Sequence, residues 1–325
     1  MTQDATGGRT GTQIGTRIGT RIGDGRIKAI RKMLFRFPRG ARAQAPARPR
    51  AAHWHKARPE FSHIVNAASL AMPHLEPYLI RTMAKARPIV SDDPALVREL
   101  NAYVAQETTH HRQHRAFNDE LAACGYESVP RIEAVLAEDY GRFGKTKSLM
   151  FNLAYAEGFE SMALAIGHML VEDRVHLFGG SDPAVASLVL WHFVEEIEHK
   201  EAAFDVFHAA GGTYGWRLYG LAFATAHIFL RTGQGYRALL REDGLWGDWR
   251  LRLRLAVLLL RIFSKLTPKL LRILSPTYLP RKVADPAWVT AWWAAYGAHP
   301  MEMGQALGDL DTTQLHKPEP ALRAA

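Results

Sequence analysis

Apolar and polar residues follow the period of an α-helix along most of residues 59–303. The longest such stretches are residues 62–86, 94–124, 147–173 and 184–209, where apolar positions recur every three or four residues. No stretch shows the period-2 pattern of a half-buried strand, and no Asn-Gly hairpin joins two apolar runs. The sequence therefore predicts an all-α fold.

Helix-breaking and helix-capping residues set the expected boundaries of these stretches. Pro73 and Pro77 interrupt the first stretch, which predicts a kink or two separate segments. Ser91 or Asp92 can cap the start of the second stretch, and Gly125 is a suitable residue to end it. The fourth stretch is expected to run as one helix to the glycine pair at residues 211–212.

The connections between the four stretches predict their topology. The first and second stretches, and the third and fourth, are joined by short links, whereas the link from the second to the third is long enough for a crossover. Two helical hairpins joined by one crossover form a ferritin-like four-helix bundle. We assign residues 59–212 to this bundle, residues 213–303 to C-terminal amphipathic helices, and residues 304–325 to a loose tail.

The C-terminal helices have arginines along one side and Leu, Ile and Phe along the other. We expect them to pack on the bundle and close the mouth of its cavity. Two alternatives stay open: a partner or oligomer interface, with a homodimer expected, and peripheral contact with an acidic membrane surface. No apolar run reaches the roughly 18–20 residues that span a bilayer.

The net charge of +9 is concentrated at the N-terminus. Residues 1–58 carry 14 Lys or Arg and two Asp, whereas the rest of the chain has a net charge of −3. We interpret residues 1–58 as a disordered basic arm; because it has no recognised binding motif, no specific nucleic-acid partner is expected. The single cysteine, Cys124, excludes an internal disulfide and suits the cytoplasm.

Candidate metal ligands recur on the four bundle helices. His192, Glu196 and His199 are spaced i, i+4 and i+7, so they share one face of a helix. Di-metal carboxylate bundles use a Glu-x-x-His pair from each of two helices and a glutamate from each of the other two. The chain offers two such pairs and two glutamates in apolar surroundings: Glu107 with His110, Glu196 with His199, Glu76 and Glu157.

Several of these assignments have alternatives. Glu107 and His110 lie in a hydrophilic stretch that is also typical of an exposed helix face. His192 is an additional ligand candidate, and a histidine outside the minimal set is as often a partner that holds a ligand. Glu160 and His114 are the candidate proton-transfer residues, and Glu160 can instead pair with a basic residue.

Three segments resemble the bacterial proteins known as predicted metal-dependent hydrolases. These are QETTHHRQHRAFNDEL (106–121), AEGFESMALA (156–165) and EEIEHKEAAFDVF (195–207). The resemblance covers roughly residues 60–285 and aligns Glu157, rather than Glu160, with the family's usual third-helix glutamate. The spacing of His192, Glu196 and His199 is also similar to that in the p-aminobenzoate N-oxygenase family, which implies His192 as a ligand of a di-iron site.

The ligand types point to two divalent metal ions, with iron preferred and manganese or zinc as alternatives. We expect O₂-dependent oxidation or oxygenation of a small apolar substrate, with an external electron donor. One alternative is hydrolysis of an ester or amide by a metal-activated water. The other is iron binding or storage without catalysis.

Overall fold

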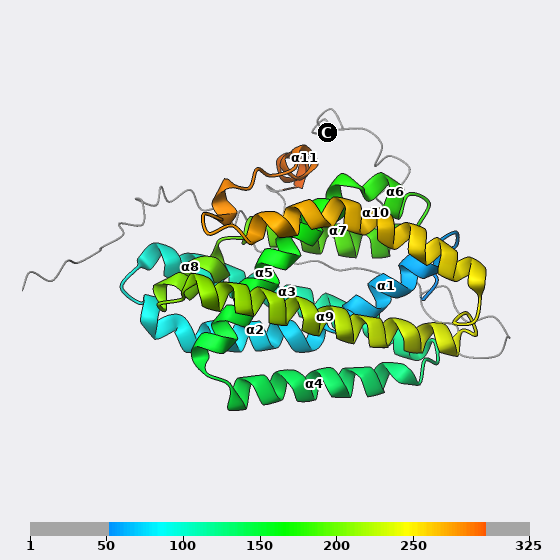
Figure 1. Ribbon diagram of the computed structural model, residues 1–325, viewed down its shortest axis with the longest axis horizontal. Coiled ribbons are helices and arrows are strands. Elements are labelled where there is room, and N and C mark those ends of the chain that lie inside the picture. The colour runs from blue at the N-terminus through cyan, green and yellow to red at the C-terminus, as the bar shows by residue number, and fades with distance from the viewer. Residues whose placement is uncertain (1–51, 297–325) are drawn as a thin grey trace, which may run out of the picture.

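The structure, a computed structural model, describes residues 52–296 (Figure 1). Within this range it consists of helices and connecting turns without a strand, which confirms the predicted all-α fold. The bundle region contains α1 (Pro59–Ser69), α2 (Met72–Ala86), η1 (Arg87–Val90), α3 (Pro94–Ala123), α4 (Ser128–Thr146), α5 (Leu149–Glu172), α6 (Arg174–Phe178), α7 (Pro183–Glu198) and α8 (Ala202–Ala209). The C-terminal region contains α9 (Tyr214–Glu242), α10 (Trp249–Ile273), η2 (Pro280–Lys282) and α11 (Ala287–Tyr296).

Side-chain caps fix where the long helices begin. Asp93, rather than the expected Ser91 or Asp92, caps α3: its carboxylate accepts from the backbone N–H groups of Ala95 and Leu96 at 3.0 Å. The cap lies one residue later than expected because Pro94 takes the first helical position, which needs no N–H donor. Gly125, with φ +86°, follows the end of α3 as predicted.

Two of the predicted stretches are divided. The first separates into α1 and α2, with Pro73 in the first turn of α2 and Pro77 inside it. The fourth was expected to be one helix over residues 184–209, but α7 ends at Glu198 and α8 begins at Ala202. His199 is therefore the C-cap residue of α7.

α5 is the central helix of the molecule and is buried along almost its whole length (Figure 1). It contacts α2, α7, α8, α9 and α10. At its crossing with α9 the two backbones touch, since a Cβ on Gly220 would collide with the carbonyl group of Ala154, and one on Gly158 with the backbone of Leu221. The expected crossover between the hairpins contains α4, which packs on α2 and α9.

Residues 52–58, which the sequence assigned to the basic arm, pack on the bundle. Trp54 is buried and donates from its indole nitrogen to Asn66. His53 and His63 each contact Asp243, at the end of α9, with Nε2–Oδ2 distances of 2.6 and 2.8 Å. The rest of the predicted arm, and the predicted tail at residues 304–325, lie outside the described residues.

In the C-terminal region, α9 lies along α5 and α1, and α10 contacts α5 and α1. Among residues 52–296, no helix combines the length and the apolar character needed to cross a bilayer.

Candidate metal centre

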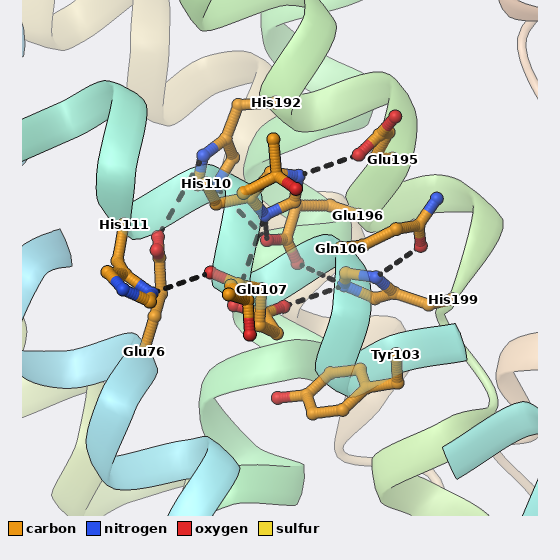
Figure 2. A network of polar contacts seen from close by, with 12 residues as sticks. Glu76, Tyr103, Gln106, Glu107, His110, His111, His192, Glu195, Glu196 and His199 are labelled. Carbon is orange, nitrogen blue, oxygen red and sulfur yellow. Dashed lines mark hydrogen bonds and ion pairs between the residues drawn. The ribbon is translucent and has the colours of Figure 1, made fainter. Parts of the chain in front are cut away.

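The expected ligand helices are α2, α3, α5 and α7, and the structure brings most of the candidate ligands together between them (Figure 2). Glu76 comes from α2, Glu107 and His110 from α3, and Glu196 from the last turn of α7. These side chains are almost completely buried, with 0 to 1% of each exposed. The alternative of an exposed Glu107–His110 face is therefore wrong.

One set of ligand atoms gathers around the Nε2 atom of His199. Its distances to carboxylate oxygens are 3.1 Å for Glu196 Oε2, 3.3 Å for Glu107 Oε1 and 3.4 Å for Glu160 Oε2. We call Glu107, Glu160, Glu196 and His199 the His199 set; their ligand atoms lie within 4.8 Å of one another. Three carboxylates and one imidazole form a donor set that suits a divalent metal ion.

A second set lies beside the first and contains Glu76, Glu107, His110, His192 and Glu196, which we call the His110 set. The Nδ1 atom of His110 lies 3.9 Å from Glu107 Oε2 and 3.8 Å from Glu196 Oε1. The Nε2 atom of His192 lies 3.1 Å from the same Glu196 Oε1, and its Nδ1 atom lies 3.9 Å from Glu76 Oε1.

Glu107 and Glu196 belong to both sets and divide their oxygens between them. In each carboxylate, one oxygen lies near His199 and the other near His110. A carboxylate whose two oxygens belong to neighbouring ligand sets has the geometry of a bridge between two ions. Glu107 and Glu196 therefore connect the two ligand sets.

Outer partners fix the tautomers of His110 and His199. His110 donates from Nε2 to Glu195 at 3.1 Å, so its Nδ1 atom presents a lone pair to the carboxylates. His199 donates from Nδ1 to Gln106 Oε1 at 3.1 Å (Figure 2). Gln106 donates in turn to Glu198. Metal-bound histidines in proteins are commonly held by such outer hydrogen bonds.

His114 holds His192 in a similar way. The Nε2 atom of His114 lies 3.0 Å from Nδ1 of His192, and its Nδ1 atom lies 2.8 Å from the hydroxyl of Ser69. Ser69 donates its own proton to Asn118, so His114 donates to Ser69 and accepts from His192. In the neutral imidazole that a metal requires, this chain would leave Nε2 of His192 without a proton and directed at Glu196.

The two glutamates of α5 lie differently from the expected arrangement. Glu160, expected to transfer protons, belongs to the His199 set, and Tyr103 donates to its Oε1 at 2.7 Å. Glu157, expected to bind metal, is absent from every group of ligand atoms found among the described residues. Its Oε1 accepts from the hydroxyl of Ser161 at 2.9 Å.

Four polar residues that surround the ligands were not among the candidates from the sequence, namely Tyr103, Gln106, Glu195 and Glu198. Tyr103 and Gln106 precede Glu107 by four residues and one residue, and Glu195 and Glu198 flank the second Glu-x-x-His pair. Helical spacing from a ligand is a usable signal for Tyr103. The other three lie on neighbouring helix faces, and helical spacing does not show which residues those faces contact.

Burial controls the electrostatics of the centre. Burial, followed by repulsion from Glu107, raises the pKa of Glu76 well above its usual value. Burial and Glu196 likewise raise the pKa of Glu160 to about 7. For Glu196, burial acts in the same direction, but His199 and His192 outweigh it and hold its pKa well below the usual range. Burial lowers the pKa of His110, which favours the neutral form that a metal requires.

The atoms left without hydrogen bonds test whether metal ions fit here. Both oxygens of Glu76 and of Glu107, Oε2 of Glu160 and Nδ1 of His110 are buried without a hydrogen-bond partner. Each such group costs about 1–3 kcal/mol, and more when it is charged. When all four carboxylates are ionised they carry a charge of −4, which bound divalent cations would neutralise. The residues present therefore fit bound divalent metal.

A third cluster of potential ligands does not need an ion. His53 and His63 approach one oxygen of Asp243 at 2.6 and 2.8 Å, which are hydrogen-bond distances. Tyr126 also donates to Asp243 at 2.9 Å. We interpret this cluster as a clamp between the N-terminal segment and the end of α9.

A cavity of about 190 Å³ lies between α5, α10 and the segment around η2. Ser161, Leu164 and Ala165 of α5 line one side of it, and Lys269 and Arg272 of α10 line the other. None of the ligands of the centre lines this cavity.

Comparison with known proteins places the chain in a family. Residues 38–284, well over half of the chain, match the family described as predicted metal-dependent hydrolase. The chain belongs to this family. The match includes every residue of the two ligand sets and agrees with the resemblance noted from the sequence. No curated protein and no solved structure matches the chain.

Proposed function

We propose that this chain is a metal-dependent enzyme with a dinuclear centre in a ferritin-like arrangement of α2, α3, α5 and α7. The observation that carries the proposal is the division of the Glu107 and Glu196 oxygens between the His199 set and the His110 set. The proposed ligands of the two ions are Glu76, Glu107, His110, Glu160, His192, Glu196 and His199. Iron is our preferred metal, and manganese or zinc is the alternative.

Bound metal ions would supply Lewis acidity and, in the case of iron, electrons for the reduction of O₂. We propose O₂-dependent oxidation of a small apolar substrate as the reaction. The ligands are no more than 6% exposed, which admits a small molecule such as O₂ more readily than an ester that must bring its carbonyl group to the ions. The external electron donor expected from the sequence belongs to this proposal.

The residues around the centre have distinct parts in this proposal. Tyr103 holds Glu160 in place through a 2.7 Å hydrogen bond and is the proton donor nearest to that carboxylate. His114 orients His192 rather than supplying a ligand itself. The buried aromatic ring of Trp191 packs edge-on against His110, with ring centroids 4.9 Å apart, and excludes water from that side.

Hydrolysis is the second candidate, and the family description favours it. In this reaction the same ligands would lower the pKa of a water molecule and polarise an ester or amide carbonyl. The two reactions differ in their need for O₂ and in the metals that support them.

The deciding experiment measures metal content and O₂ uptake on the purified full chain. We expect about two metal ions per chain, and O₂ consumption after anaerobic loading with ferrous iron. Two bound zinc or manganese ions, with ester or amide cleavage in the absence of O₂, would replace oxidation by hydrolysis. Uptake of far more than two irons per chain would favour storage. Fewer than one ion per chain, unchanged in Glu107→Ala and Glu196→Ala variants, would refute the dinuclear centre.

A further inference from the structure

α10 has two apolar faces, and only one of them packs on the protein. Leu251, Leu258, Leu266 and Ile273 are buried against the bundle. Leu253, Val257 and Leu260 are 58, 62 and 73% exposed. At 3.6 residues per turn these three side chains lie roughly opposite the buried ones. A helix that only covered the bundle would have polar residues there.

The exposed apolar side chains continue along the helix and onto α9. Trp249, Phe263 and Leu271 extend the stripe on α10 towards both ends, at 67, 43 and 60% exposed. Phe229 and Leu230 of α9 are also exposed, and the Phe229 and Phe263 rings lie 6.3 Å apart. Figure 1 shows α9 and α10 running along the same side of the molecule. We call these exposed side chains of α9 and α10 the hairpin face.

The charge of α10 has one sign only. Its sequence contains seven Lys or Arg and no Asp or Glu. Arg261, Lys265 and Lys269 pair with the carboxylates of Asp173 and Glu172 at the end of α5. The others, Arg250, Arg252, Arg254 and Arg272, are exposed beside the apolar stripe.

We propose that the hairpin face binds the surface of a lipid bilayer that contains anionic lipids. Exposed Leu, Phe and Trp side chains flanked by arginines are the composition of helices that lie in the membrane interface. Their apolar groups enter the acyl boundary, and the guanidinium groups reach the phosphates. The helix lies on the bilayer and does not cross it, in agreement with the absence of a membrane-spanning helix among residues 52–296.

The charge pattern distinguishes a bilayer from a second copy of the chain. In a two-fold dimer each face meets an identical face. Arginines of one α10 would then lie near arginines of the other, without a carboxylate on either helix to neutralise them. An anionic lipid surface is complementary to both the apolar stripe and the arginines, and each basic residue near such a surface strengthens binding by about fivefold.

The test is co-sedimentation of the full chain with vesicles of phosphatidylcholine and phosphatidylglycerol, compared with vesicles of phosphatidylcholine alone. We expect binding to the first and little to the second. The double variant Leu253→Asp/Leu260→Asp should weaken binding at least tenfold. Arg250→Glu/Arg254→Glu should weaken it by a similar factor and reduce its dependence on salt. Val135→Asp, which changes an exposed apolar residue on α4, is the matched control and should bind as the unchanged chain does.

The basic residues of the N-terminal arm are a competing source of binding to anionic vesicles. If the arm alone binds them, the Leu253→Asp/Leu260→Asp variant will bind as well as the unchanged chain, and the proposal is wrong. It is also wrong if the unchanged chain does not bind, or if it is a dimer in solution that this variant converts to a monomer. Thermal unfolding of each variant shows whether a loss of binding reflects a loss of the fold.

Discussion

Replacing each of the two α5 glutamates by glutamine, one at a time, distinguishes a proposed metal ligand from a residue with a structural role. Glu160 supplies an oxygen 3.4 Å from His199 Nε2, whereas Glu157 bonds to Ser161. Loss of an outer partner of a metal ligand typically costs 10–100-fold in metal affinity. Loss of a ligand that also lowers the site's charge from −4 to −3 should cost more, so we expect a decrease of about 100-fold or more for Glu160→Gln. Glu157→Gln should leave the affinity nearly unchanged.

The assay is a competition titration of the metal-free chain against a chelator of known affinity, together with the metal content after desalting. Thermal unfolding of the metal-free proteins provides a second measurement. Burial raises the pKa of both Glu160 and Glu157 to about 7, so a neutral side chain at either position should stabilise the metal-free form near neutral pH. Equal losses of affinity in the two variants, or a larger loss in Glu157→Gln, would contradict the assignment and return the ligand role to Glu157.

Three further predictions concern the support of the centre and the fold. Replacing Gln106 by Leu removes the hydrogen-bond acceptor for His199 and should lower metal affinity about 10–100-fold. The helical circular dichroism should stay unchanged. An unchanged chelator titration would show that Gln106 does not support His199 as a ligand. Gly220→Ala should destabilise the chain by about 1–3 kcal/mol in urea unfolding because the new Cβ meets α5, whereas Gly215→Ala, with open space around it, should not. Although burial opposes it, hydrogen bonding to His53 and His63 lowers the pKa of Asp243. The contribution of Asp243 to stability is therefore complete above the unfolded-state pKa of about 3.9 and is lost as the pH falls below that value. Asp243→Asn should reduce this acid sensitivity, and an identical pH profile of stability would refute the clamp.

The sequence predicted the helical class, the ligand-bearing helices and six of the seven proposed ligands, because helical periodicity and the Glu-x-x-His spacing are local. The sequence favoured Glu157 over Glu160 as the metal ligand of α5, whereas in the structure the side chain of Glu160 lies with the other candidate ligands. Residues three apart in a helix lie only about 60° apart around its axis. Sequence spacing therefore assigns Glu157 and Glu160 to the same helix face. The packing of the neighbouring helices, which sequence spacing does not contain, separates them.

The end of α7 and the outer hydrogen bonds were beyond sequence reasoning for a related reason. The apolar pattern continues from α7 into α8, and no Gly or Pro marks the break after Glu198. The partnerships of Gln106 and Glu195 connect positions more than 80 residues apart in the chain. Such contacts depend on how α3 meets α7, which is a property of the assembled bundle.

The break after Glu198 gives the centre a further source of negative potential. The C-terminal end of an α-helix carries about half a negative charge from its aligned peptide dipoles. The last turn of α7 contains Glu196 and no basic residue. Lys200, just beyond it, donates to the carbonyl of Val283 and to Asp285. The negative potential of the helix end thus adds to that of the carboxylates. This potential attracts protons as well as metal ions, and both bind to the same ligand atoms. We therefore expect acidification to release the metals before it unfolds the bundle.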